Sequence, residues 1–137
     1  MLDTEVYARL VAAKIFIDEH YDEPLNLERI SRKAYLSPFH FHRLFSSVYK
    51  RTPHQYLTAR RMEKARDLLS ENRPVKEVCH EVGFGSPASF SVLFKKEIGF
   101  APQYYRNMAW LKKQKAMKEP RVVIPNCFAA QFGGIKK

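Results

Sequence analysis

Apolar residues recur at three- and four-residue spacing along much of the chain, which predicts a protein built from α-helices. The pattern is most informative in residues 37–56. Ser37 and Pro38 form a helix-start signal, because serine caps free backbone N–H groups and proline fits the first helical position. The apolar side chains that follow fall on one narrow arc of the predicted helix: Phe41, Leu44, Phe45 and Val48.

The opposite arc of this helix carries Phe39, His42, Arg43 and Ser46. An aromatic, a histidine and an arginine on a solvent face are unusual for a helix that only packs, but they suit a helix that reads base edges. An ordinary amphipathic helix with a stray Phe39 is the alternative interpretation of this stretch taken alone.

The same pattern occurs a second time along the chain, which indicates one supersecondary unit used twice. In each copy a shorter helical pattern and a turn precede the helix that begins with Ser-Pro. Two helices joined by a short turn, the second with a polar outer face, form the helix-turn-helix layout. The matching pairs are Ser37 with Ser86, Pro38 with Pro87, Phe41 with Phe90, Leu44 with Leu93, Phe45 with Phe94, Pro53 with Pro102 and Tyr56 with Tyr105.

The whole pattern predicts an all-α fold of about seven helices, with two helix-turn-helix subdomains joined by a long connector helix and a short irregular C-terminal tail. The helices are expected at 4–20, 27–34, 37–52, 54–71, 75–82, 86–98 and 102–109, and residues 108–119 could continue the last one. The corresponding divisions are residues 1–53, 54–72, 73–109 and 110–137.

Composition points to an anionic partner. The 137 residues carry a net charge of +10, which makes nucleic acid the first candidate and an anionic membrane surface the second. No apolar run is long enough for a transmembrane helix, and residues 1–21 contain too many acids for a signal or transit peptide. Cys79 and Cys127 are too few for a disulfide framework, so we expect a cytoplasmic location.

Other chemistry is weakly represented. His40 and His42 supply two of the ligands of a zinc site without a partner set, Cys79 falls beside an apolar stripe, and Cys127 has no adjacent base. A serine triad, a phosphate loop and paired carboxylates are all missing from the sequence. We therefore expect neither an enzyme nor a bound metal or cofactor.

Together, the repeat and the connector resemble the DNA-binding domain of the AraC family of bacterial transcription regulators. The matching motifs are Phe-His-Arg-Leu-Phe at 41–45, Gly-Phe at 83–84, Phe-Ser-Val-Leu-Phe at 90–94 and Gly-Phe-Ala-Pro at 99–102. The resemblance implies seven helices and two reading helices that enter successive major-groove segments on one face of DNA. Lys50 and Val92 depart from it, because many members carry glycine and arginine there, and no separate ligand-binding or dimerisation domain is expected in this chain.

Candidate site residues follow from the two outer arcs. Arg43 can bond guanine O6 and N7, with a surface salt bridge as the alternative, whereas the second arc is chemically poorer. Arg61 lies on an apolar stripe, so a half-buried salt bridge is its first expected role and a phosphate contact its second. The candidate base-reading residues are Phe39, His42, Arg43, Ser46, Ala88, Ser91, Val92 and Lys95; the candidate phosphate contacts are Ser37, His40, Arg60, Lys64, Ser86, Lys96, Gln103 and Arg106.

These observations predict a sequence-specific, double-stranded DNA-binding regulator of transcription, acting through RNA polymerase or by occlusion. The alternative is a basic interaction module that binds an acidic protein or an anionic membrane. Two reading units make a monomer sufficient for a bipartite site with centres about 10 bp apart. The tail could either contact flanking phosphates or dock on the domain.

Overall fold

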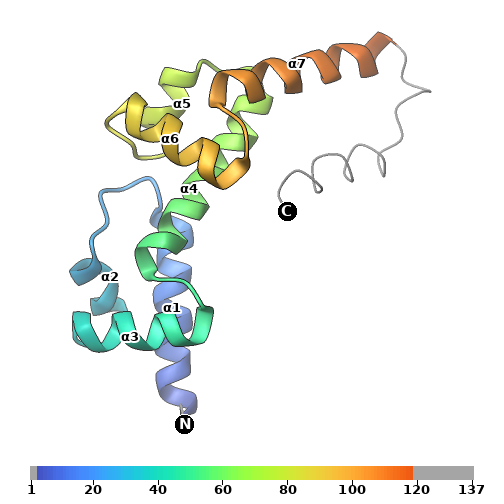
Figure 1. The fold of residues 1–137 in the computed structure, drawn as a ribbon. Coiled ribbons are helices and arrows are strands. Elements are labelled where there is room, and N and C mark those ends of the chain that lie inside the picture. Colours follow the sequence, from blue (N-terminus) through green and yellow to red (C-terminus); the bar gives the residue numbers. More distant parts are fainter. Residues whose placement is uncertain (1–2, 119–137) are drawn as a thin grey trace. The chain divides into compact units, whose positions relative to one another are not determined.

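A computed structural model describes residues 3–118, all of whose regular structure is helical (Figure 1). The chain divides into two units, residues 1–61 and 62–137, and each is considered by itself. No helix of the described part is long and apolar enough to cross a membrane. The helices are α1 (Thr4–His20), α2 (Leu27–Lys33), α3 (Pro38–Tyr49), α4 (Pro53–Ser70), α5 (Val75–Glu81), α6 (Pro87–Ile98) and α7 (Pro102–Lys118).

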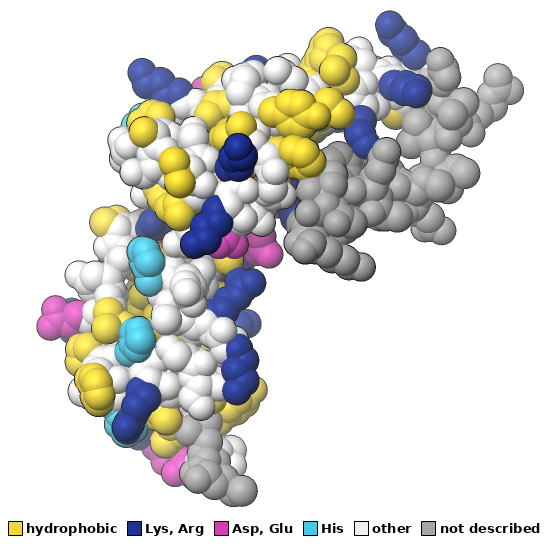
Figure 2. All heavy atoms as spheres, in the orientation of Figure 1, with side chains coloured by type: hydrophobic (Ala, Val, Ile, Leu, Met, Phe, Trp, Pro, Cys, Tyr) yellow, Lys and Arg dark blue, Asp and Glu magenta, His cyan; other side chains and the backbone are white. Residues whose placement is uncertain are grey.

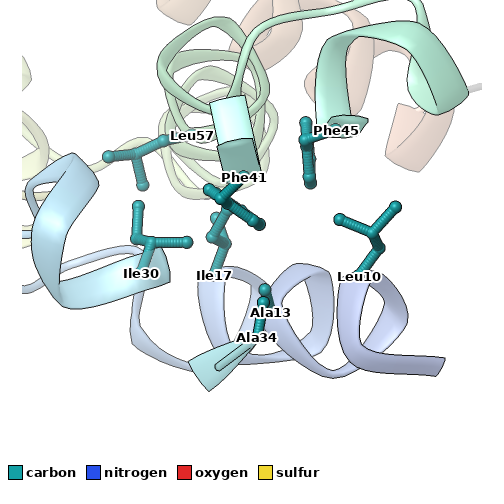
Figure 3. Packing of buried hydrophobic residues seen from close by; sticks show 8 residues of the cluster. All are labelled: Leu10, Ala13, Ile17, Ile30, Ala34, Phe41, Phe45 and Leu57. Carbon is teal, nitrogen blue, oxygen red and sulfur yellow. The ribbon is translucent and has the colours of Figure 1, made fainter. Parts of the chain in front are cut away.

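The core of the first unit lies between α1, α2, α3 and the beginning of α4 (Figure 3). Phe41 and Phe45 are fully buried and point from α3 toward α1, so α1 lies against the apolar side of α3. Burying each such ring stabilises the fold by about 1.5–3 kcal/mol. The predicted apolar arc is therefore the arc that packs. Buried residues from the other helices are Leu10, Ala13, Ile17, Ile30, Ala34 and Leu57.

The second unit repeats the packing of three aromatic side chains. The rings of Phe90 and Phe94 lie 5.7 Å apart between centroids, and the Phe94 ring lies 5.9 Å from that of Tyr105. The equivalent distances in the first unit are 5.4 Å for Phe41 and Phe45, and 6.0 Å for Phe45 and Tyr56. The internal repeat in the sequence is thus a repeat in packing. Cys79 is buried in this second unit as a small core residue, and burial raises the pKa of its thiol.

Side-chain caps begin the helices where the sequence predicts them. The Ser37 hydroxyl oxygen accepts the N–H of His40 at 3.2 Å, and the Ser86 oxygen accepts the N–H of Ser89 at 3.3 Å. The connector α4 begins at Pro53, because Thr52 and Gln55 form a capping box. The Thr52 hydroxyl accepts the N–H of Gln55, and the Gln55 side chain accepts the N–H of Thr52.

A residue in the left-handed conformation follows each of the two helices of both helix-turn-helix motifs, α2 and α3 in the first unit and α5 and α6 in the second. Gly83 (φ 98°) and Gly99 (φ 102°) do so in the second unit, as predicted for a glycine stop. In the first unit the same places are taken by Tyr35 (φ 55°) and Lys50 (φ 59°). The hydrogen bonds match as well, since the N–H groups of both Lys50 and Gly99 bond a carbonyl four residues back at 2.9 Å. A side chain in this conformation is strained by about 1–2 kcal/mol.

The structure adds detail to two expectations. Arg61 is half-buried, as predicted, but its described bonds go to backbone carbonyls: Nε donates to Tyr21 O at 2.6 Å and Nη2 to Glu23 O at 2.8 Å. Burial lowers the pKa of its guanidinium. The final helix extends past Ala109 to Lys118, so residues 110–118 belong to α7. The remaining tail and Cys127 lie outside the described residues.

Candidate nucleic-acid interface

The outer arc of α3 is built around Phe39 and Arg43. Phe39 is 75% exposed, and the Arg43 guanidinium lies 5.6 Å from the centre of its ring, one helical turn further on. A cation over an aromatic face is attracted by the ring's quadrupole, which orients the guanidinium. Within residues 3–118 no carboxylate pairs with Arg43, so its donors are available to a ligand.

His42 and Ser46 occupy the same arc but are less free. His42 is exposed and lines a hollow of about 150 Å³ that also includes Asn26, His54 and Leu57. Its ring therefore lies on the side of α3 that faces the beginnings of α2 and α4. The Ser46 hydroxyl donates to the carbonyl oxygen of His42 at 2.7 Å, which leaves it only its acceptor lone pairs for a base. Figure 2 shows histidine and basic side chains among hydrophobic ones on this face of the first unit.

The outer arc of α6 is apolar by comparison. Val92 is 70% exposed and lines a shallow depression with Ala88, Ser89 and Leu93. Of the predicted reading residues on this helix, Lys95 is exposed and Ser91 is half-buried. This surface offers methyl groups and one charge, which can meet thymine methyls and phosphates but provides little hydrogen-bonding specificity.

Both helices present their N-terminal ends to solvent. Ser37 and Ser86, the capping residues, are exposed, and so is His40 in the first turn of α3. Free backbone N–H groups and the helix dipole make such ends suitable for phosphate oxygens. Lys64 and Lys96, two of the predicted phosphate contacts, have exposed side chains.

Three predicted phosphate contacts have partners inside the protein. Arg60 Nε lies 3.0 Å from Asp18 Oδ1, with both side chains about one-third exposed, so binding a phosphate would compete with an ion pair. Arg106 Nη2 donates to the carbonyl oxygen of Asn72 at 3.1 Å, and Gln103 Nε2 to Asn107 Oδ1 at 3.0 Å. Arg60 therefore has a structural role that its position on the connector did not reveal.

Comparison with known proteins identifies the family. A model of a helix-turn-helix domain family matches residues 30–108. The regulatory protein SoxS of Salmonella typhimurium is 32% identical over 93 residues, which are 67% of this chain and 87% of SoxS. The chain belongs to the AraC family of helix-turn-helix regulators. The probable transcriptional regulator LumQ of Photobacterium leiognathi is 33% identical over 92 residues, which are 66% of this chain and 37% of LumQ.

Solved structures agree with membership of the AraC family. The DNA-binding domain of AdpA, solved in complex with a target DNA, has a TM-score of 0.68 at 28% identity and is covered to 96% by 81% of this chain. The C-terminal domain of AraT, a response regulator from Geobacillus stearothermophilus, has a TM-score of 0.68 at 30% identity, with 78% of this chain covering 87% of that domain. These likenesses favour DNA over an acidic protein or a membrane as the principal partner.

Sequence reasoning missed two features of the first unit. One is the cluster in which Asp18 accepts the Tyr56 hydroxyl at 2.5 Å as well as pairing with Arg60. No local spacing connects residues so far apart along the chain. The other is the strained turn at Tyr35, for which a signal exists: aligning the helices that precede the two turns, Leu27 with Val75, places Tyr35 opposite Gly83.

Proposed function

We propose that this AraC-family chain is a sequence-specific, double-stranded DNA-binding regulator of transcription that reads two major-groove segments with α3 and α6. The observation that carries the proposal is the exposed pair of Phe39 and Arg43 on a helix whose other face is core. A helix anchored through one face leaves the other free to enter a groove. The solved complex of AdpA, whose domain is similar, supports the same kind of ligand.

The two helices contribute differently. On α3, Arg43 bonds guanine O6 and N7, Phe39 packs on a thymine methyl, and His42 reaches a base or phosphate at the edge of the groove. On α6, Ala88 and Val92 supply only apolar contacts, so the second unit binds mainly the sugar-phosphate backbone of the duplex. Phosphates are held by the N-terminal ends at Ser37 and Ser86, by His40 in the first turn of α3, by Lys95 and Lys96 in the last turn of α6, and by Lys64 on α4.

The proposal extends to partners and location. One chain carries two reading helices, so a monomer is sufficient for a bipartite site. Regulation then proceeds through contact with RNA polymerase or by occluding it, in the bacterial cytoplasm where the DNA lies. This follows from the family rather than from any surface described above.

The test is selection of binding sites from random duplexes with the full chain, followed by titration of the selected site. Arg43→Ala should weaken binding to the selected site by about 1–3 kcal/mol and abolish the base preference at one position of that site. Arg51→Ala is the matched control, because Arg51 is also exposed but follows the end of α3. It should leave the preferred sequence unchanged. If Arg43→Ala weakened selected and random duplexes equally, base reading by Arg43 would be wrong.

A further inference from the structure

The first unit has a hollow of about 300 Å³ that the proposed DNA contacts do not use. It lies between α1, the C-terminal half of α2 and the turn that follows α2. Two aromatic and three cationic side chains line it. Its lining residues are Phe16, Arg29, Arg32, Lys33 and Tyr35.

The cations of this hollow are only partly neutralised. Arg29 pairs with Glu23 at 2.8 Å, and Arg32 lies 3.7 Å from Glu28 with both side chains exposed. Within the described residues Lys33 has no carboxylate partner, and its Nζ lies 4.9 Å from the centre of the Phe16 ring. The hollow therefore combines an excess of positive charge with the aromatic ring of Phe16.

The second unit shows that this charge is not required by the fold. Counting back from the left-handed residue of each turn, Lys33 corresponds to Glu81 and Arg29 to Glu77. There both glutamates form ion pairs with Arg73 of the same unit. The same surface thus lacks an excess of positive charge in the second unit and carries one in the first.

Tyr35 adds an independent observation. It stands in the left-handed conformation that Gly83 takes in the second unit, and its side chain is 81% exposed at the rim of the hollow. A bulky residue in this conformation is held at a cost, and such strain concentrates at functional sites. An exposed aromatic ring on the same hollow as the unpaired Lys33 provides stacking and charge together.

The hollow does not belong to the base-reading surface. Phe16 lies on α1, and α1 packs against the side of α3 that carries Phe41 and Phe45 (Figure 3). Phe39 and Arg43 lie on the exposed arc of α3 instead. A groove entered by that arc would leave α1 on the far side of α3. The opening of the hollow is broad and its rim is charged, which suits a protein segment better than an enclosed small molecule.

We propose that this hollow is a docking site for an acidic segment of a partner protein, in which carboxylates flank an aromatic or apolar side chain. The carboxylates pair with Arg32 and Lys33, and the apolar side chain lies between Phe16 and Tyr35. Charge-assisted bonds to a guanidinium and an ammonium supply specificity for acids. The site remains open while α3 holds DNA.

The experiment titrates the full chain with a fluorescent synthetic peptide in which glutamates flank one phenylalanine, and with the same peptide carrying glutamines. Only the glutamate peptide should bind. Lys33→Glu should weaken it by about tenfold, whereas Lys76→Glu, an equal charge change on an exposed lysine of α5, should have little effect. Tyr35→Gly should weaken binding of the glutamate peptide while leaving the fold at least as stable. This result would separate a weakened site from a damaged fold.

Each other outcome would overturn the docking site. Equal losses in Lys33→Glu and Lys76→Glu would show a general charge effect, and unchanged binding in Tyr35→Gly would show that Tyr35 is only a turn residue. Displacement of the peptide by the selected duplex would assign the hollow to DNA, and displacement by free glutamate would assign it to a small anion. Because the peptide titration needs no DNA, it can fail while the proposed DNA binding stands.

Discussion

Replacing Lys50 by glycine should make the first unit more stable. Lys50 follows α3 with φ 59° and ψ 22°, and its N–H bonds Ser46 O at 2.9 Å. Gly99 ends α6 through the equivalent bond to Lys95 O, also at 2.9 Å. The structure therefore needs the left-handed conformation at both positions, but only one of them has the residue that adopts it without strain.

The size of the gain follows from two opposing terms. The Cβ of Lys50 costs about 1–2 kcal/mol in this conformation. Glycine recovers that amount, but it also loses about 0.5–1 kcal/mol more backbone entropy on folding than a residue with a side chain. The net stabilisation is about 0.5–1 kcal/mol, which corresponds to an increase of about 2–8 °C in the melting temperature of a domain of this size.

Thermal unfolding followed by circular dichroism measures the change, and Lys50→Ala is the matched control. Alanine removes the same charged side chain but keeps the Cβ, so it should leave the melting temperature near that of the original chain. Gly99→Ala should lower the melting temperature, because φ is 102° there and the strain would be new. If Lys50→Gly were no more stable than Lys50→Ala, strain at this turn would not be the explanation.

Three further changes test the remaining roles. Val92→Ala should change affinity for the selected site by less than about twofold, and equally strong base preference under α3 and α6 would contradict it. Arg61→Met should lower stability by about 2 kcal/mol in urea unfolding, because Tyr21 O loses its guanidinium donor and Glu23 O keeps only the N–H of Leu25; unchanged stability would refute that role. Truncation after Lys118 should reduce the slope of log K against log salt by about 0.9 for each phosphate that the tail neutralises. A lower melting temperature with an unchanged slope would instead indicate a docked tail.

The sequence was sufficient for what depends on local spacing. The apolar arcs, the serine caps and the glycine stops at Gly83 and Gly99 are properties of a few consecutive residues, and the structure has them where the spacing predicts them. The exposure of Phe39 followed from the same periodicity. Repetition strengthened each of these inferences, since two copies of one pattern are harder to explain by chance than one.

What the sequence did not predict depends on approach between distant residues. Arg60 lies on an outward position of α4, yet it meets Asp18 of α1, and helical spacing within α4 contains no information about α1. Arg61 was placed correctly at the edge of the core, but its bonds to the carbonyls of Tyr21 and Glu23, which follow α1, were not predicted. Both arginines occupy positions that looked suitable for phosphate, which shows why charge and helical phase alone cannot assign a DNA contact.

The two units share a fold but differ in their turns, their ion pairs and their exposed helix faces. In the second unit both turns have glycine, Arg73 pairs with both of its neighbouring glutamates, and the outer arc of α6 is nearly apolar. In the first, both turns hold a strained side chain and the outer arc carries an unpaired arginine. Strain and unpaired charge reduce stability, so they persist where something other than folding maintains them. Because the first unit has both strained turns and the unpaired arginine on its reading arc, we assign it most of the base recognition and assign the second unit the firmer anchoring.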